Sequence, residues 1–279
     1  MEQAAGDYIL FQDVTYRYAG SPFNALNNVN LAISRGTFTA VIGPNGSGKS
    51  TLARQINGLL LPSSGIVTVD GMETGNALHI PEIRRRVGFV FQNPDNQLVG
   101  TTVEEDIAFG PENLGMDPPA IRESVLYALA VTGLEALAER PPHTLSGGQK
   151  QQLAIAGAVA MKTECLVLDE PTSMLGPAGK RSVMDLLRKI KKDLGMTVVL
   201  VTHSIEEAVS ADRVLVIHKG RVFMDGTPEE VFRSRGVLTG IGLEIPGPME
   251  LALRLWERGV PTPDPVLTVD ELVNFLCRL

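Results

Sequence analysis

The sequence predicts an α/β fold built on a mainly parallel sheet that helices cover on both faces. Short strands that are apolar throughout, such as CLVLD and TVVLVTH, alternate with helical stretches over most of the chain. Fully apolar strands separated by helices are typical of parallel sheets with both faces buried. The chain has 279 residues, of which 44% are hydrophobic, enough for one large domain with an appendage.

The first part of the chain is expected to form strands and turns. Residues 8–42 contain the runs YILFQDV, NVNLAI and TFTAVI, broken by GSP and SRG. Alternating apolar and polar residues with glycine and proline at the breaks are typical of strands joined by turns. We therefore predict an N-terminal antiparallel β subdomain ahead of the parallel sheet.

Helical patterns dominate from residue 43 onwards, and we expect helices at 49–60, 149–161, 178–194 and 205–211. Between the first two of these, residues 80–140 are interrupted by prolines, and a helical pattern occupies 119–132. We interpret this region as a helical subdomain inserted at about 93–160.

After residue 226 the pattern is helical and rich in proline, and a helical appendage is predicted over residues 236–279. Thr268 and Glu271 form a capping-box pair. The helix that they begin has an apolar face made of Leu272, Phe275, Leu276 and Leu279. Such a stripe most often packs on its own domain, and a dimerisation surface is the alternative.

Charge and cysteine content exclude several classes of protein. The formal net charge is -7, so the chain has no overall positive field for a nucleic-acid backbone, and no nucleic-acid partner is expected. Cys165 and Cys277 lie far apart without metal-ligand spacing, which suits a reducing cytoplasm. No run of eighteen apolar residues occurs, so the chain is not expected to span a membrane.

A phosphate-binding loop is predicted between an apolar strand and a helix. The stretch GPNGSGKST fits the P-loop pattern, in which glycines let backbone N–H groups surround a phosphate. A glycine-rich turn of no function would not explain the lysine, the hydroxyl and the flanking elements together. The residues expected to bind a nucleoside triphosphate are Gly43, Pro44, Asn45, Gly46, Ser47, Gly48, Lys49, Ser50 and Thr51.

Two adjacent acids end the strand in LVLDEPTSMLGPAGK. If this strand lies beside the P-loop strand, the Asp169 carboxylate faces the same Mg²⁺ ion as the Ser50 hydroxyl. Glu170 then stands near the attacking water and is the candidate general base. The alternative is that Glu170 is only a helix-capping acid in a loop.

The stretch TLSGGQKQQ, which begins at residue 144, places a serine and two glycines at the start of a predicted helix. Free N–H groups there can bind an anion; a capping serine is the simpler interpretation, but it does not explain the glycines and the glutamine. The stretch resembles the LSGGQ signature of ATP-binding-cassette (ABC) ATPases. The resemblance implies that a nucleotide held by another subunit is contacted in trans by Ser146, Gly147, Gly148 and Gln149.

The resemblance covers residues 8–235 and implies the P-loop NTPase fold of ABC ATPases, with ATP and Mg²⁺ as cofactors. Gln92 resembles the Q-loop glutamine, which senses the γ-phosphate and shares the Mg²⁺ ion. His203 resembles the switch histidine, a third candidate catalytic residue. Tyr18 resembles the aromatic residue that stacks on adenine, with Tyr16 as the other candidate.

Residues 91–115 and the run TSML are similar to the A-component ATPases of energy-coupling-factor (ECF) transporters, more to the first than to the second of their two types. The resemblance implies an ATPase at the cytoplasmic face of the membrane that powers uptake of vitamins or transition-metal ions. Its expected partners are a second ABC ATPase subunit (a paralogue or a second copy), a transmembrane T component and a substrate-binding S component.

Two positions depart from the family pattern of cassette ATPases, and the first of them leaves an alternative open. Gly176 stands where these ATPases usually have an aspartate, and Gln152 replaces a frequent arginine. Loss of the aspartate predicts that nucleotide binding survives while hydrolysis, or its communication between sites, is weakened. The alternative function is therefore a hydrolysis-impaired, regulatory subunit of the same kind of complex. A cassette for DNA repair or translation and a P-loop kinase fit the motifs less well.

Overall fold

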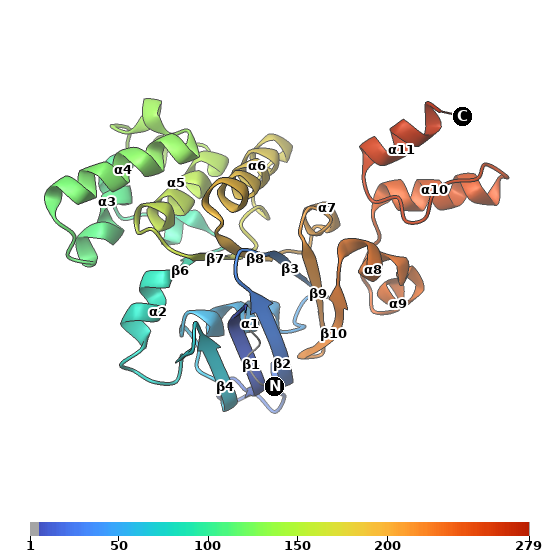
Figure 1. The fold of residues 1–279 in the computed structure, drawn as a ribbon, viewed down its shortest axis with the longest axis horizontal. Helices are drawn as coiled ribbons and strands as arrows, with labels where there is room; N and C mark the ends of the chain where they lie inside the picture. Colours follow the sequence, from blue (N-terminus) through green and yellow to red (C-terminus); the bar gives the residue numbers. More distant parts are fainter. Residues whose placement is uncertain (1–5, 279) are drawn as a thin grey trace.

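The computed structural model describes residues 6–278 and contains two sheets (Figure 1). The first sheet is antiparallel, with strand order β2-β1-β4-β5. It confirms the predicted N-terminal antiparallel region, although two of its strands come from residues beyond 42. Its strands are β1 (Asp7–Tyr16), β2 (Leu26–Ser34), β4 (Ser64–Val69) and β5 (Met72–Glu73).

The second sheet has six strands in the order β10-β9-β3-β8-β7-β6, and its strands are parallel except for the antiparallel pair β9 and β10. Every residue of β3, β7 and β8 is buried, as the apolar runs predicted. The strands are β3 (Phe38–Ile42), β6 (Val87–Val90), β7 (Cys165–Asp169), β8 (Thr197–Val201), β9 (Arg213–His218) and β10 (Arg221–Gly226).

Two hydrophobic clusters cover the two faces of this sheet. Along β7, Leu166 and Leu168 belong to one cluster, while Cys165 and Val167 belong to the other, because successive side chains of a strand point to opposite faces. The second cluster also contains the first sheet and α1. The helices next to the sheet are α1 (Lys49–Ile56), α2 (Ile80–Arg86), α6 (Pro177–Leu194) and α7 (Ile205–Ala208).

Three helices pack together on one side of the six-stranded sheet, away from the first sheet (Figure 1). A capping box at Thr102 and Glu105 begins the first of them, and Gly133 in a left-handed conformation ends the second. A short 3₁₀ turn at Pro94–Asn96 precedes the first helix, and two more, at Glu135–Leu137 and Pro142–Thr144, lie between the second and the third. The three helices are α3 (Val103–Asn113), α4 (Pro118–Thr132) and α5 (Gly147–Ala160).

The C-terminal region is helical and extends beyond β10 (Figure 1). The predicted capping box at Thr268 and Glu271 is present. Leu272 packs in a small cluster with Ala252 and Val266, whereas Leu276 on the expected apolar face is exposed, and Leu279 lies outside the described residues. The helices are α8 (Pro228–Arg233), α9 (Arg235–Gly240), α10 (Gly247–Glu257) and α11 (Val269–Leu276).

None of the helices in residues 6–278 has the length and apolarity needed to cross a membrane. The predicted fold class is confirmed: the structure has the mainly parallel sheet, the N-terminal antiparallel sheet, the group of helices beside the parallel sheet and the C-terminal helices. The limits 93–160 and the division of the chain at residue 235 stay predictions.

Candidate functional site

The P-loop connects β3 to α1, and two of its glycines are required by close backbone approach. A Cβ at Gly43 would lie 2.1 Å from the carbonyl oxygen of Ile217, and one at Gly48 would lie 2.4 Å from that of Ala25. Both residues also have positive φ angles, 155° and 110°. Because other residues would clash and be strained there, the sequence at these positions is dictated by the loop geometry.

Lys49 is buried at the start of α1, with a 5% exposed fraction. Its Nζ donates hydrogen bonds to the carbonyl oxygens of Gly43, at 2.8 Å, and of Pro44, at 3.2 Å. Burial lowers the pKa of Lys49, while the nearby acids Glu170 and Asp169 act in the opposite direction. The structure thus holds a cation across the loop that is predicted to bind phosphates.

Asp169 ends β7 beside this loop, as predicted, and is almost fully buried. Ser50 Oγ donates a hydrogen bond to its Oδ1 at 2.7 Å, and Arg54 Nη2 lies 3.3 Å from its Oδ2. The hydroxyl and the carboxylate oxygens are the hard donors that Mg²⁺ prefers. Within residues 6–278 no group of three or more acidic, histidine or cysteine side chains could hold a metal ion. A sparse set of oxygens suits Mg²⁺, which commonly keeps waters and binds nucleotide phosphates.

Glu170 follows directly and adopts a left-handed backbone, with φ 52°, which is strained for a residue with a side chain. Its Oε2 lies 3.2 Å from Gln92 Nε2 and 3.4 Å from His203 Nδ1. Gln92 Nε2 also donates to Ser173 Oγ at 3.1 Å. The structure therefore gathers the three candidate catalytic side chains at the carboxyl ends of β6, β7 and β8, where ligands bind in open parallel sheets.

A cavity of about 390 Å³ lies between the P-loop and the segment after β1. Tyr18 lines it and shares a hydrogen bond of 3.0 Å with Thr51 Oγ1. Tyr16 instead packs against the core of the first sheet and touches the Tyr18 ring edge to face, with centroids 4.9 Å apart. Of the two tyrosines that the sequence offered, Tyr18 is the one at the cavity. Glu170 and most of the P-loop also line this cavity.

The predicted signature residues lie elsewhere, because none of residues 146–149 lines this cavity. Ser146 caps α5: its Oγ accepts from the N–H of Gln149, and Gln149 Oε1 accepts from the N–H of Ser146 at 2.9 Å. Gly148 packs against α6, where a Cβ would lie 3.2 Å from Gly179 Cα. The serine and the glutamine thus do form a capping box, while the glycines allow a close helix contact.

The departures at Gly176 and Gln152 have no steric cause in the described chain. Gly176 precedes α6 with an ordinary φ of -69°, and no heavy atom lies within 4 Å of a Cβ built there. Gln152 Nε2 donates to Ser182 Oγ at 3.0 Å and so links α5 to α6. Close packing around the backbone therefore does not require a glycine at position 176.

Sequence reasoning missed three residues near the site. Arg54 is four residues after Ser50 on the same helix, so their shared face was visible in the sequence. Phe23 lines the cavity beside the P-loop and is 78% exposed, but a single aromatic residue in a loop carries no pattern. Glu207 accepts hydrogen bonds from Thr172 and Thr202 on two loops of the site. No sequence motif links Glu207 to these loops, which only the fold brings together.

Comparison with known proteins identifies the family. The family model described as ABC transporter matches residues 26–173. The Energy-coupling factor transporter ATP-binding protein EcfA1 of Caldanaerobacter subterraneus subsp. tengcongensis is 51% identical over 270 residues, which cover 96% of this chain and 98% of that protein. The chain belongs to the energy-coupling factor transporter ATP-binding proteins. It is an ABC ATPase that powers an importer of this kind, as its motifs indicated.

Two solved structures place this ECF ATPase among the ABC cassettes. The structure of cbiO1 from Clostridium perfringens, part of the ABC transporter complex cbiONQ, has a TM-score of 0.77 and 39% identity, covering 91% of this chain and 98% of that one. The dimeric cassette MJ0796, in a post-hydrolysis state bound to ADP and Pi, has a TM-score of 0.70 and 34% identity, covering 79% and 98%. The predicted resemblance to the first ECF ATPase type is confirmed by the relatives' names.

Proposed function

We propose that this ECF ATPase works as one half of an ATPase pair at the cytoplasmic face of the membrane, where it drives uptake of a vitamin or a transition-metal ion. A transmembrane T component and a substrate-binding S component would complete the importer. The observation that carries the pairing is the separation, within one chain, of the P-loop cavity from the signature segment 146–149. The dimeric state of the MJ0796 cassette and the place of cbiO1 in a complex support it.

In the proposed pair, each ATP bound by the P-loop of one subunit is completed by the signature segment of the other. Ser146 and Gly147 are exposed at the start of α5, where the N–H groups and the helix dipole favour an anion. Two nucleotides would be buried between two such subunits. Closure therefore depends on nucleotide, and a single subunit is inactive.

The chemistry follows from the cluster at the carboxyl ends of the strands. Ser50, Asp169 and Gln92 would hold Mg²⁺, which supplies charge stabilisation to the phosphates when bound. Glu170 orients or deprotonates the attacking water, since it is the acid that faces both Gln92 and His203. His203 and Gln92 contact the γ-phosphate, and Lys49 neutralises the charge that develops on it.

The segment after Gln92 is the proposed contact with the T component. Val99 and Phe109 are exposed there, at 59% and 51%, and a cavity of about 480 Å³ lies between Leu98 and His143. Because this segment begins at the glutamine beside Glu170, a change at the γ-phosphate can move it. Crosslinking from cysteines introduced at Val99 or Phe109 should capture a membrane subunit, and capture only of other cytoplasmic proteins would contradict this contact.

The test of the whole proposal is purification of the tagged ATPase from native membranes. We expect a second ATPase, a membrane subunit and a small substrate-binding membrane protein to accompany it, with nucleotide turnover that exceeds that of the isolated chain. Light scattering during the assay gives the oligomeric state. A strictly monomeric preparation that hydrolyses ATP at the full rate of the complex would overturn the paired mechanism.

A further inference from the structure

Glu207 is a buried acid that forms no ion pair with any basic residue of the part of the chain that the structure describes. It lies in α7, directly after the loop that carries His203, and its exposed fraction is 5%. None of the ion pairs found within residues 6–278 includes it. A buried carboxylate is strongly destabilising unless hydrogen bonds satisfy it, so its contacts show what keeps it there.

Both carboxylate oxygens of Glu207 accept hydrogen bonds from threonines of two different loops. Thr172 Oγ1 donates to Oε1, and Thr202 Oγ1 donates to Oε2 at 2.7 Å. Both threonines are buried, with exposed fractions of 2%. The N–H of Ser204 donates to Thr202 Oγ1 at 3.0 Å, which leaves the threonine proton for Glu207. The carboxylate therefore connects two loops by hydrogen bonds and does not cap its own helix.

These two loops carry the candidate general base and the switch histidine. Thr172 is two residues after Glu170, and Thr202 immediately precedes His203. The loops also meet through the N–H of Glu170, which donates to the carbonyl oxygen of Val201 at 2.9 Å. Glu207 adds a second connection between the loops, and it is not among the residues that line the cavity beside Glu170.

We propose that Glu207 is a positioning residue for ATP hydrolysis, which fixes the loop of Glu170 relative to the loop of His203. This inference rests on the roles proposed above for those two side chains. Glu170 Oε2 and His203 Nδ1 lie 3.4 Å apart, and His203 is about half exposed, so its own packing does not hold it. Displacement of either side chain by about 1 Å lowers the rate of a positioned reaction on the order of 10²-fold.

A purely structural role for Glu207 makes a different prediction. As the third residue of α7 it could cap the helix start, but α7 has no side-chain cap hydrogen bond. A structural acid would affect the unfolding temperature without changing the turnover of folded protein. A positioning acid changes kcat while the KM for ATP, which depends on the P-loop, stays the same.

The test uses the purified complex and follows ATP turnover and thermal unfolding for each variant. Glu207→Ala should lower kcat about tenfold or more, with the KM for ATP within about twofold of wild type. Glu207→Gln keeps one oxygen acceptor and the shape, and should recover most of the lost rate. Thr172→Val and Thr202→Val should each cause part of the defect, and Thr172→Val should add little to Glu207→Ala. The matched control is Glu206→Ala, which removes an exposed carboxylate on the same helix that accepts a hydrogen bond from Ser204 Oγ.

Three outcomes would overturn the inference: kcat unchanged in Glu207→Ala at temperatures where it is folded, kcat and KM altered together, or an equal defect in Glu206→Ala. If Glu207→Ala does not fold, the two threonine variants decide by the same criteria. Wild-type turnover is measured first. A wild-type complex without ATPase activity would contradict the proposed function, whereas an active wild type with an unaffected Glu207→Ala contradicts only the role of Glu207.

Discussion

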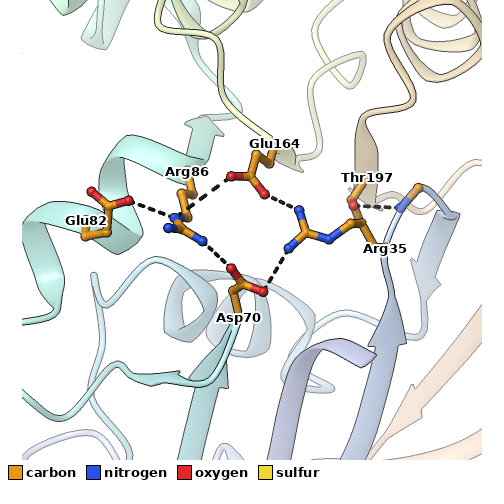
Figure 2. A network of polar contacts seen from close by, with 7 residues as sticks. Arg35, Asp70, Glu82, Arg86, Glu164 and Thr197 are labelled. Carbon is orange, nitrogen blue, oxygen red and sulfur yellow. Dashed lines mark hydrogen bonds and ion pairs between the residues drawn. The ribbon is translucent and has the colours of Figure 1, made fainter. Parts of the chain in front are cut away.

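The two ends of strand β7 lie at opposite edges of the six-stranded sheet, and they place acids in opposite surroundings. At the amino end, Glu164 pairs with Arg35 and Arg86, and both arginines also pair with Asp70 (Figure 2). At the carboxyl end, Asp169 has only Arg54 at 3.3 Å, and Glu170 has only the His203 ring at 3.4 Å among the ion pairs of the described chain.

The difference separates acids that are paired in an ion-pair network from acids with few ion-pair partners, which are the ones that we propose to bind Mg²⁺ and water. The network in Figure 2 connects the first sheet, α2, β7 and the turn before β3, and the N–H of Gly36 adds a hydrogen bond to Thr197 at 2.9 Å. Partly exposed pairs of this kind contribute about 0–1 kcal/mol each. The strained backbone of Glu170 instead costs on the order of 1–3 kcal/mol. Ligands bind at the carboxyl ends of strands in open parallel sheets. We therefore expect backbone strain at that end of β7 and stabilising ion pairs at the other.

The largest expected effect is that of Glu170→Gln. Removing the candidate base should lower kcat by about 10²–10⁴-fold, while ATP binding persists because the P-loop is intact. The unfolding temperature should not fall, since no strong ion pair is lost. Single-turnover hydrolysis and thermal unfolding measure the two quantities.

Glu164→Gln is the matched control for this prediction, because it removes an acid from the other end of the same strand. Its turnover should equal that of wild type. Equal losses of turnover in the two variants would contradict the division between the edges.

Lys49→Met should have the next largest effect, on nucleotide affinity. A charge-assisted hydrogen bond contributes about 1.5–3 kcal/mol, so the dissociation constant for ATP should rise about 10–100-fold. Titration with a fluorescent ATP analogue measures it, and an unchanged affinity would contradict the predicted phosphate contact.

The same variant tests the electrostatics of the buried lysine. Burial places the pKa of Lys49 below its ordinary 10.5 in the folded protein. Between the two values the unfolded chain binds more protons, so wild-type stability gains from rising pH there. Lys49→Met should lack this gain. Denaturant unfolding at pH 8 and pH 10 should therefore show a smaller change in the free energy of unfolding between the two pH values for the variant than for wild type.

Gly176→Asp should change turnover by a few-fold. A Cβ at this position meets no heavy atom within 4 Å, and in the proposed pair we expect residue 176 to lie at the interface between the two ATPases. We expect the substitution to raise turnover of the assembled complex and not of the isolated chain. Gly179→Asp is unsuited as a control because Gly179 packs against Gly148. Gly195→Asn is a better control, since Gly195 lies at the other end of α6. Unchanged turnover in Gly176→Asp would contradict the predicted weakening of hydrolysis.

The sequence predicts which side chains meet at the carboxyl edge because they belong to local motifs. Gly43 to Thr51 follow a fixed spacing, and Asp169 with Glu170 end an apolar strand, so parallel topology brings them together. The sequence favoured Tyr18 over Tyr16 only by resemblance, since the choice depends on β1 ending at Tyr16 and a pattern places the end of an element only to within a residue or two.

The amino edge, by contrast, has no motif to find. Its network joins Arg35, Asp70, Arg86 and Glu164, which are far apart in the chain and meet only when the sheet forms. The pairing of Glu207 with Thr172 is equally long-range. Burial adds a further effect that sequence does not state: it raises the pKa of the Cys165 thiol, so this cysteine stays protonated and unreactive.

The smallest expected effect belongs to Arg86→Met at the amino edge. Loss of its contacts with Asp70, Glu82 and Glu164 should lower the free energy of unfolding by about 1 kcal/mol, because each partly exposed pair is weak. At 1 M salt the screening length is about 3 Å, so such pairs contribute less. The free energies of unfolding of the variant and of wild type, measured with denaturant, should therefore converge at this salt concentration. Turnover of the folded complex should stay at the wild-type level, in contrast to the salt-independent defect of Glu170→Gln. If Arg86→Met instead lowers kcat at a temperature where it is fully folded, the charges at the amino edge also position the catalytic edge, and the two ends of β7 act as one unit.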